Sequence, residues 1–194
     1  MPRALSFVLH LATSTCFAQD GVFEILHNKK AIGTIDVLRV TQGDSVTYSM
    51  ISRSSFTLLR RREIRTVART LCVAGQVTNC LTTTHDCGAL RDSSAMRAIG
   101  RRGLYVAHPD KVYGADLPRN TWTGTRMYYE EPVGLDSVFV ESELADCPLE
   151  RIAPGEYILK LPNRESNRYI YRNGILREIH IDRGWLGLVF RRVE

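Results

Sequence analysis

The sequence contains no apolar run long enough to cross a membrane as a helix. A spanning helix needs about 20 consecutive apolar residues, and the apolar stretch that follows Arg3 is shorter than this. Lysine is also scarce, because it occurs only at positions 29, 30, 111 and 160, so the formal net charge of +5 comes almost entirely from arginine. Because no apolar run is long enough to span a membrane, we expect no transmembrane segment.

The sequence also lacks the common catalytic motifs. It has no G-x-S-x-G, no H-E-x-x-H, no P-loop and no G-x-G-x-x-G. Glu130 and Glu131 are adjacent, and neighbours in an extended segment point to opposite faces, so they make a poor acid–base pair. His180 lies in a strand pattern and is interpreted as a strand residue rather than a base. We expect a binding or structural protein without a cofactor rather than an enzyme.

The first residues have the order of a secretory signal. One positive charge at Arg3 precedes an apolar stretch, small residues at Cys16 and Ala18, and the polar pair Gln19-Asp20. The residues before Cys16, Thr13-Ser14-Thr15, fit lipid attachment poorly, and the other alternative is a buried first strand. We expect cleavage near Ala18 and a periplasmic or secreted protein.

Cleavage at this point would leave one domain. Removing 18 of 194 residues leaves 176, and the hydrophobic content of 44% is that of a globular protein. The interpretation is a signal peptide over residues 1–18 and a single β-rich domain over residues 19–194. A basic composition can indicate nucleic acid, but export argues against that partner.

Four cysteines remain after cleavage: Cys72, Cys80, Cys87 and Cys147. An even number in an exported chain permits two disulfides. A hairpin turn at Ala74-Gly75 would place Cys72 and Cys80 on opposite sides of the ribbon, so Cys80–Cys87 is the preferred pair, across a loop. Cys80, His85 and Cys87 could also be read as metal ligands, but their spacing matches no standard zinc pattern, and we expect no metal.

Strand patterns account for most of the chain. In "SVTYSMI", the apolar residues alternate with polar ones, as in a half-buried strand. The stretch "FTLLRRREIRTVARTLC" is ambiguous and is interpreted as a long strand, whereas "RNTWTGTRMYYEEP" is interpreted as a short helix or turn. Short strands with regular turns predict a mainly β fold: a single curved antiparallel sheet or incomplete barrel with at most a short helix.

The clearest hairpin lies near the end of the chain. Asn173-Gly174 suits a type I′ turn, so "RYIYR" and "ILREI" should pair. This register sets Tyr171 opposite Leu176 and Tyr169 opposite Glu178, with Ile170 and Ile179 on the other face.

Several of these stretches together resemble a known family. They are "FEILHNKKAIGTIDVLRVTQGDSVTYSMIS", "MYYEEP", "VFVESE" and "GEYILKLPNRESNRYIYRNGILREIHI", in this order. They resemble a family of exported bacterial β-rich domains of unknown function, whose strand pattern is similar to that of periplasmic lipoprotein-carrier half-barrels. Residues 72–100 depart from this resemblance. The likeness concerns the fold and assigns no activity.

Aromatic and basic residues provide the candidate binding site. A concave sheet face could use aromatic rings to bury an apolar ligand, and arginines could bind its anionic head group. The candidate residues are Trp122, Tyr128, Tyr129, Tyr169, Tyr171, Arg61 and Arg65. The alternative is that the aromatic rings build the core and that the arginines protect sheet edges.

These observations lead to two functional hypotheses. The first is a non-enzymatic envelope domain that binds a lipid or other amphiphile in the concave face of its sheet. The second is a structural or assembly accessory that binds another envelope protein.

Overall fold

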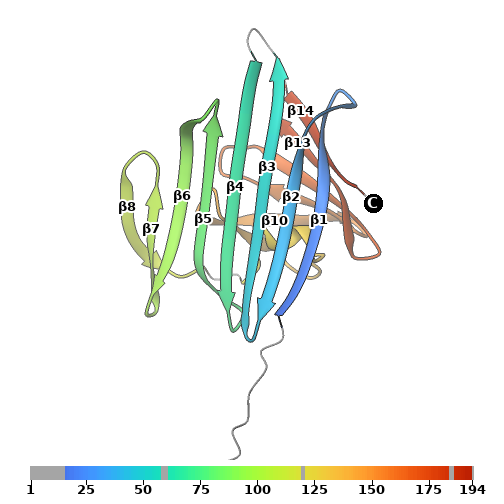
Figure 1. Ribbon diagram of the computed structural model, residues 1–194. Helices are drawn as coiled ribbons and strands as arrows, with labels where there is room; N and C mark the ends of the chain where they lie inside the picture. The colour runs from blue at the N-terminus through green and yellow to red at the C-terminus, as the bar shows by residue number, and fades with distance from the viewer. Residues whose placement is uncertain (1–15, 58–60, 119–120, 184–185, 194) are drawn as a thin grey trace, which may run out of the picture.

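One antiparallel sheet of fourteen strands makes up nearly all of the described chain, as the computed structural model shows (Figure 1). The structure describes residues 16–57, 61–118, 121–183 and 186–193. The strands are β1 (Cys16–His27), β2 (Lys30–Gln42), β3 (Ser45–Thr57), β4 (Arg61–Val73), β5 (Gln76–Asp86), β6 (Ala89–Ile99), β7 (Arg102–Ala107), β8 (Lys111–Asp116), β9 (Ser137–Val140), β10 (Ala145–Ala153), β11 (Glu156–Lys160), β12 (Ser166–Arg172), β13 (Ile175–Arg183) and β14 (Leu186–Arg192). The only helix in these ranges is the 3-10 turn η1, Arg126–Tyr128. The mainly β prediction is confirmed.

The sheet curls but does not close into a barrel. Its strand order is β8-β7-β6-β5-β4-β3-β2-β1-β14-β13-β12-β11-β10-β9. Every strand therefore pairs with its neighbours in the chain, except that β8 and β9 are separated and β1 pairs with β14. Pairing of the first and last strands brings the two halves of the chain together, and β8 and β9 form the edges of the sheet.

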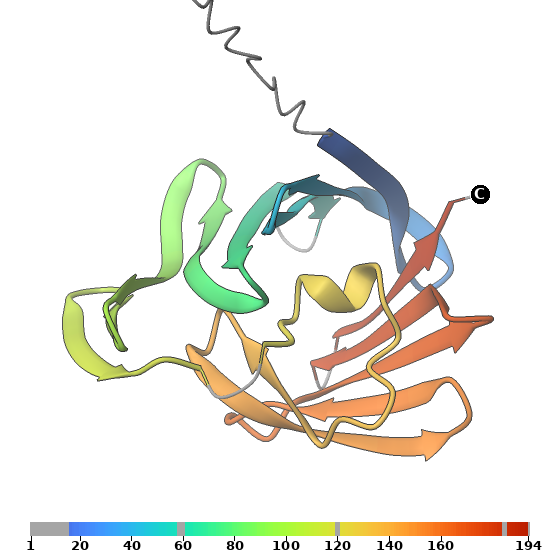
Figure 2. The same cartoon turned by 90° about the horizontal axis from the view of Figure 1, so that it is seen from below.

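Residues 121–135, which precede β9, lie inside this curl. Figure 2 shows η1 between the strands of the N-terminal half and those of the C-terminal half. Met127 is fully buried there, and the hydroxyl of Tyr171 donates a 2.7 Å hydrogen bond to its carbonyl oxygen. We call residues 121–135 the plug.

Apolar side chains on the inner face of the sheet form two core clusters. The larger one packs the plug against β1, β2 and β9–β13, with Phe23, Ile35 and Tyr157 fully buried. The smaller one joins β3–β7 to Phe139 of β9 and includes Met96. Inner and outer residues alternate along the strands because successive side chains in a strand point to opposite faces.

The C-terminal hairpin is partly as predicted. Asn173 and Gly174 both have positive φ, at 55° and 74°, and Tyr171 pairs with Leu176. The predicted Tyr169–Glu178 pair is wrong, because a bulge in β13 places Tyr169 opposite Ile179 instead. One extra residue in a strand reverses the faces of those beyond it, so Ile179 lies in the core.

Two other predictions concern residues that lie partly or wholly outside the described ranges. The expected leader, residues 1–18, lies mostly outside the described residues, since β1 begins at Cys16, and cleavage near Ala18 stays a prediction. The expected turn at Gly184-Trp185 lies outside them altogether. Among the described residues, no helix has the length and apolar character that crossing a membrane requires.

Candidate functional site

A cavity of about 310 Å³ lies between the plug and the inner face of the sheet. Strands from both halves of the chain contribute to its walls, because β1 and β14 join these halves into one curved surface. Its lining residues belong to β2–β5, the plug, β9, the turn after β9, β11–β14 and the loop between β11 and β12. A volume of this size lies at the lower end of the range for small-ligand sites.

Glu141, which directly follows β9, is a buried carboxylate in this cavity. Its side chain is held by the plug and by β4: Oε1 accepts hydrogen bonds from the hydroxyl of Thr70 at 2.7 Å and the hydroxyl of Thr125 at 2.6 Å. The backbone N–H of Thr125 donates a third, at 3.1 Å. The residue is only 4% exposed. These three hydrogen bonds offset the free-energy cost of removing the charged Oε1 from water.

The other oxygen of this carboxylate has a different environment. No residue in the described part of the chain donates a hydrogen bond to Oε2 of Glu141. Gly124 of the plug lies beside it, and a Cβ atom added at Gly124 would be 2.8 Å from Oε2. Oε2 therefore retains its capacity to accept hydrogen bonds, and the glycine prevents a side chain from covering it.

Thr82 of β5 provides a second polar group in the cavity wall. Its side chain is 8% exposed and its hydroxyl has no hydrogen-bond partner among the described residues. Thr82 pairs directly with Ser94, whose hydroxyl donates a 2.7 Å hydrogen bond to the carbonyl oxygen of Glu141. An unpartnered buried hydroxyl is costly, and this one lies in the same region as Glu141.

The remaining wall is largely apolar and aromatic. Tyr128 of the plug and Tyr169 of β12 face the cavity together with Leu159, Ile181 and Phe190. Burial raises the pKa of Tyr128 far above its ordinary value, so its hydroxyl stays neutral at physiological pH. The cavity thus combines an apolar body with a few polar groups.

Among the described residues that line the cavity, the charged side chains are all acidic. They are Glu141, Glu143 and Glu165, and none of the described lining residues is Lys, Arg or His. Arg126, the arginine of the plug, is turned to other partners: its guanidinium is 2.6 Å from Glu130 and lies 4.1 Å from the ring centre of Trp122. The lining is therefore acidic, although the whole chain carries an excess of positive charge.

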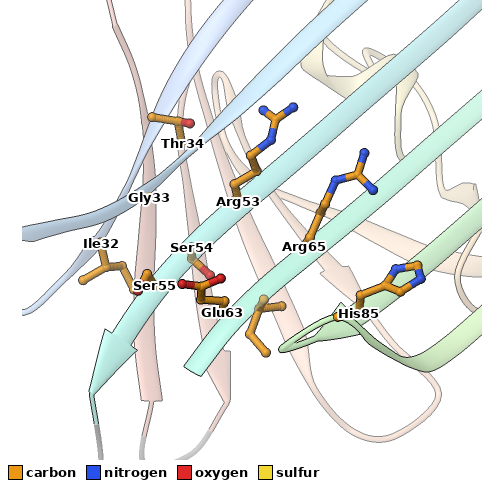
Figure 3. Close-up of a pocket in the computed structure, with 11 residues that line it drawn as sticks. Ile32, Gly33, Thr34, Arg53, Ser54, Ser55, Glu63, Arg65 and His85 are labelled. Carbon is orange, nitrogen blue, oxygen red and sulfur yellow. The ribbon is translucent and has the colours of Figure 1, made fainter. Parts of the chain in front are cut away.

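A second cavity, of about 620 Å³, lies at one end of β2–β5 (Figure 3). Cross-strand pairing places Arg53, Arg65 and His85 in one row on the outer face. Arg53 is 2.6 Å from Asp36, whereas Nδ1 of His85 has no hydrogen-bond partner among the described residues. This cavity has a basic side and is separate from the acidic interior one.

Comparison with protein families identifies the chain. A family model described as a domain of unknown function, DUF6134, matches residues 23–193. The chain belongs to the DUF6134 family. Comparison with curated proteins finds no match.

Among solved structures, the DUF6134 domain is similar to a crystal structure of a beta-barrel-like protein of the domain of unknown function DUF1849 from Brucella abortus. The two share 11% sequence identity with a TM-score of 0.55, over 90% of this chain and 95% of that chain. Such a low identity shows likeness of fold only. It agrees with the predicted incomplete barrel, whereas the similarity to lipoprotein carriers stays a prediction.

In the structure of this DUF6134 domain, the predicted aromatic residues fall into two groups. Tyr128 and Tyr169 line the interior cavity. Tyr171 is bonded to Met127, and the hydroxyl of Tyr129 lies 3.4 Å from the carbonyl oxygen of Ser49. These two tyrosines join the plug to the sheet, whereas Trp122 stacks with Arg126 within the plug. None of the three lines the cavity.

The two predicted arginines lie outside the interior cavity. Arg65 lines the second cavity, on the outer face. Arg61 is exposed and forms a 3.1 Å ion pair with Glu63. Neither of them reaches a ligand held in the interior cavity.

The predicted Cys80–Cys87 disulfide is wrong. The residues between them form a continuous strand, β5, rather than a loop. At about 3.3 Å per residue an extended chain separates these cysteines by far more than the 7 Å or so that a bridge allows. Cys72, Cys80, Cys87 and Cys147, whose side chains the structure describes, are all free thiols.

The predicted orientation of Cys72 and Cys80 is also wrong. Cys72 pairs with Val77 as expected, but a bulge then places Cys80 opposite Thr70 instead of Arg69. The extra residue restores Cys80 to the inner face, so both thiols are buried in the smaller core cluster. His85, by contrast, lies on the outer face, so Cys80 and His85 of the alternative metal set point to opposite faces of β5, and Cys87 follows the strand.

Sequence reasoning missed the three polar residues that characterise the cavity. Glu141, Thr125 and Thr82 meet only through tertiary contacts, since they belong to the end of β9, the plug and β5. Glu141 lies in an acidic stretch, where nothing distinguishes it from its exposed neighbours. The preceding run Val138-Phe139-Val140, buried throughout, is the one local sign that this segment enters the interior.

Proposed function

We propose that this DUF6134 domain is a binding protein of the cell envelope that holds a small amphiphile in its interior cavity. The observation that carries the proposal is the cavity between the plug and the sheet, with apolar walls and a buried carboxylate held by three donors. Small-ligand sites are typically concave and apolar, with a few placed polar groups that orient the ligand. Export to the envelope forms part of the proposal and is supported by the signal-like residues 1–18.

The dimensions of the cavity limit the size of the ligand. One water molecule occupies about 30 Å³ of the liquid, so 310 Å³ corresponds to about ten non-hydrogen atoms. An eight-carbon chain with one head group fits this size. Each methylene group that it buries contributes about 0.8 kcal/mol, so an eight-carbon amphiphile is a suitable probe.

The test uses three probes of equal chain length: n-octylammonium, 1-octanol and octanoate. Titration calorimetry with the purified full chain should find at least one of them bound, with one molecule per chain. Ser52 lies on β3 and lines the cavity, so Ser52→Phe should fill it and weaken that binding at least tenfold.

Ser49→Phe is the matched control, because Ser49 lies on the same strand and pairs with Arg69, which is exposed. This variant should bind as the wild type does. Circular dichroism verifies that both variants are folded. Binding that survives in folded Ser52→Phe, or no binding of any of the three probes, contradicts the proposal.

A second candidate function is that of an assembly accessory, which one observation favours. The outer face carries a groove of about 630 Å³ near the free edge strand β8, with Leu81, Leu104 and Val106 exposed in it. Unpaired sheet edges can accept an extended segment of another protein as an added strand. If the protein has this function, a photo-crosslinking residue placed at position 106 should capture an envelope partner, and Leu104→Glu should abolish that crosslink. The same substitution should leave binding of the octyl probes unchanged.

A further inference from the structure

We infer that the interior cavity selects a cationic head group, so that its ligand is a small alkylammonium compound rather than a fatty acid or a phosphorylated lipid. The inference rests on the proposed function and specifies the chemical class of the ligand. It reverses the expectation from the sequence, in which arginines bind an anionic head group. Three observations carry it: the charges that line the cavity, the free oxygen of Glu141 and the unpartnered hydroxyl of Thr82.

The charges in the wall disfavour an anion. The charged groups among the described lining residues are carboxylates, and Glu141 is the most deeply buried of them. An anionic head group beside a carboxylate would be repelled, and the low dielectric of a protein interior strengthens that repulsion. Arg126 does not relieve it, since it is bonded to Glu130.

The hydrogen bonds around Glu141 leave one oxygen for the ligand. Thr70 and Thr125 donate to Oε1, which fixes the orientation of the carboxylate. Oε2 has no donor among the described residues and lies next to Gly124, where no side chain covers it. A protonated amine can donate to Oε2, and a charge-assisted bond of this kind is about twice as strong as a neutral one.

Thr82 supplies independent evidence for a polar ligand group at this position. Thr82 is more than nine-tenths buried, and its hydroxyl has no hydrogen-bond partner in the described part of the chain. It adjoins Ser94, which is itself bonded to the main chain of Glu141. An ammonium group carries three donors, so it can engage Oε2 of Glu141 and the oxygen of Thr82 together.

The apolar part of the ligand would lie against the opposite wall. Leu159, Tyr169, Ile181 and Phe190 come from β11–β14 and surround the cavity on the side of the C-terminal half. Tyr169 also offers an aromatic ring, and such rings attract cations. A buried carboxylate in a cavity with such an apolar wall suits a linear amine.

The closing experiment compares the three octyl probes, which differ only in head-group charge. Octylammonium should bind at least about tenfold more tightly than 1-octanol. A hydrogen bond between charged groups is stronger than a neutral one, and the difference in free energy corresponds to about this ratio of dissociation constants. Octanoate should bind most weakly. If octanoate or 1-octanol binds as tightly as octylammonium, and Ser52→Phe abolishes that binding, the inference is wrong while the proposed function holds.

If none of the three probes binds, or if Ser52→Phe binds them all as the wild type does, the proposed function is wrong and the inference with it. The two failures are therefore distinguishable. The wild-type series together with Ser52→Phe decides between them.

A charge-neutralising variant tests the role of Glu141 directly. Glu141→Gln keeps the shape and an acceptor oxygen but removes the charge, so the preference for octylammonium over 1-octanol should fall at least fivefold. Because Glu141 also holds the plug, Glu143→Gln is a companion that leaves those hydrogen bonds in place and should reduce the same preference. Glu150→Gln is the matched control, because Glu150 is exposed, pairs with Lys160 and does not line the cavity. An unchanged preference in folded Glu141→Gln and Glu143→Gln would contradict the inference.

Discussion

The hydroxyl of Thr125 lies 2.6 Å from Oε1 of Glu141 and donates a hydrogen bond to it. This contact joins the plug to the end of β9. Thr70 of β4 donates to the same oxygen, so one buried carboxylate links three parts of the chain that are distant in sequence. The strength of the link can be measured.

Thr125→Val removes the hydroxyl and keeps the shape of the side chain. We expect the free energy of unfolding to fall by about 1–3 kcal/mol, since a hydrogen bond to a charged, buried acceptor is lost. Urea denaturation measures this change. Thr83→Val is the control, because Thr83 lies on the outer side of β5 and is half-buried; its effect should be small. Equal losses of unfolding free energy in the two variants would show that the hydrogen bond from Thr125 to Glu141 adds no specific stability.

Gly33→Ala should be strongly destabilising. Gly33 pairs with Ser54, and a Cβ atom at Gly33 would meet the carbonyl oxygen of Arg53 and lie 2.6 Å from the Cα atom of Ser54. Backbone atoms cannot move aside as a flexible side chain does, so we expect a loss of about 1–3 kcal/mol or more in the free energy of unfolding.

Gly187→Ala is the matched control for this substitution. Gly187 also lies in a strand, β14, but a Cβ atom there would meet nothing within 4 Å. Its effect should remain below about 1 kcal/mol. Thermal or urea denaturation of the two variants side by side measures the difference, and a Gly33→Ala protein as stable as Gly187→Ala would contradict the close approach of β2 and β3.

The cysteines should differ sharply in reactivity. Burial raises the pKa of Cys72 to about 11, of Cys80 to about 12 and of Cys147 to about 11, so these thiols are protonated and shielded at pH 8. Cys87 is exposed. Because the thiolate is the reactive form, a chromogenic thiol reagent should modify one thiol rapidly in a Cys16→Ser variant and three more only after unfolding.

Cys87→Ser identifies that rapid thiol, because it should abolish the fast phase and leave the other three unchanged. Fewer than four reactive thiols after unfolding without a reductant would mean that a disulfide is present. That result would contradict the free thiols of the structure.

Alkaline pH should destabilise the fold through its buried tyrosines. Burial raises the pKa of Tyr105 to about 12, and burial followed by the hydrogen bond to Glu131 raises that of Tyr157 to about 12 as well. A tyrosine whose folded pKa exceeds its unfolded value near 10 contributes stability that is fully present below pH 10 and is lost as the pH rises to 12.

The measurement is the free energy of unfolding between pH 7 and 12. It should begin to decline near pH 8.5, where the three buried cysteines titrate in the unfolded chain, and should fall more steeply above pH 10, where the tyrosines do. Tyr157→Phe removes one of the titrating groups and should make the decline shallower. A decline of equal slope in this variant would mean that other groups cause it.

The mass of the protein purified from an exporting host tests the leader. A denatured chain that begins at Gln19 is expected. Cleavage there would shorten β1 by three residues and leave its pairing with β2 intact from Gln19–Arg39 onward. A chain that retains a lipid on Cys16 would show instead that the protein is anchored.

Local features of the sequence determined the strands and several turns. The alternation in "SVTYSMI" lies within β3, and the expected short helix or turn contains η1. The long strand expected over residues 56–72 is β4 only from Arg61 onward, because Phe56 and Thr57 belong to β3. Asn173-Gly174 formed the predicted turn because these two residues tolerate positive φ. Each of these depends on residues within a few positions of one another.

Only the tertiary structure determined which faces are buried beyond a bulge and which residues form the cavity. The bulges near Cys72 and Tyr171 reversed the faces of Cys80 and Ile179, and a bulge responds to the fit of a strand to its partners rather than to its own sequence. The cavity depends on the pairing of β1 with β14, which curls the sheet, and on the plug within it. Glu141, Thr82 and Thr125 thus become neighbours through long-range packing, which the alternation of apolar and polar residues along one strand does not encode.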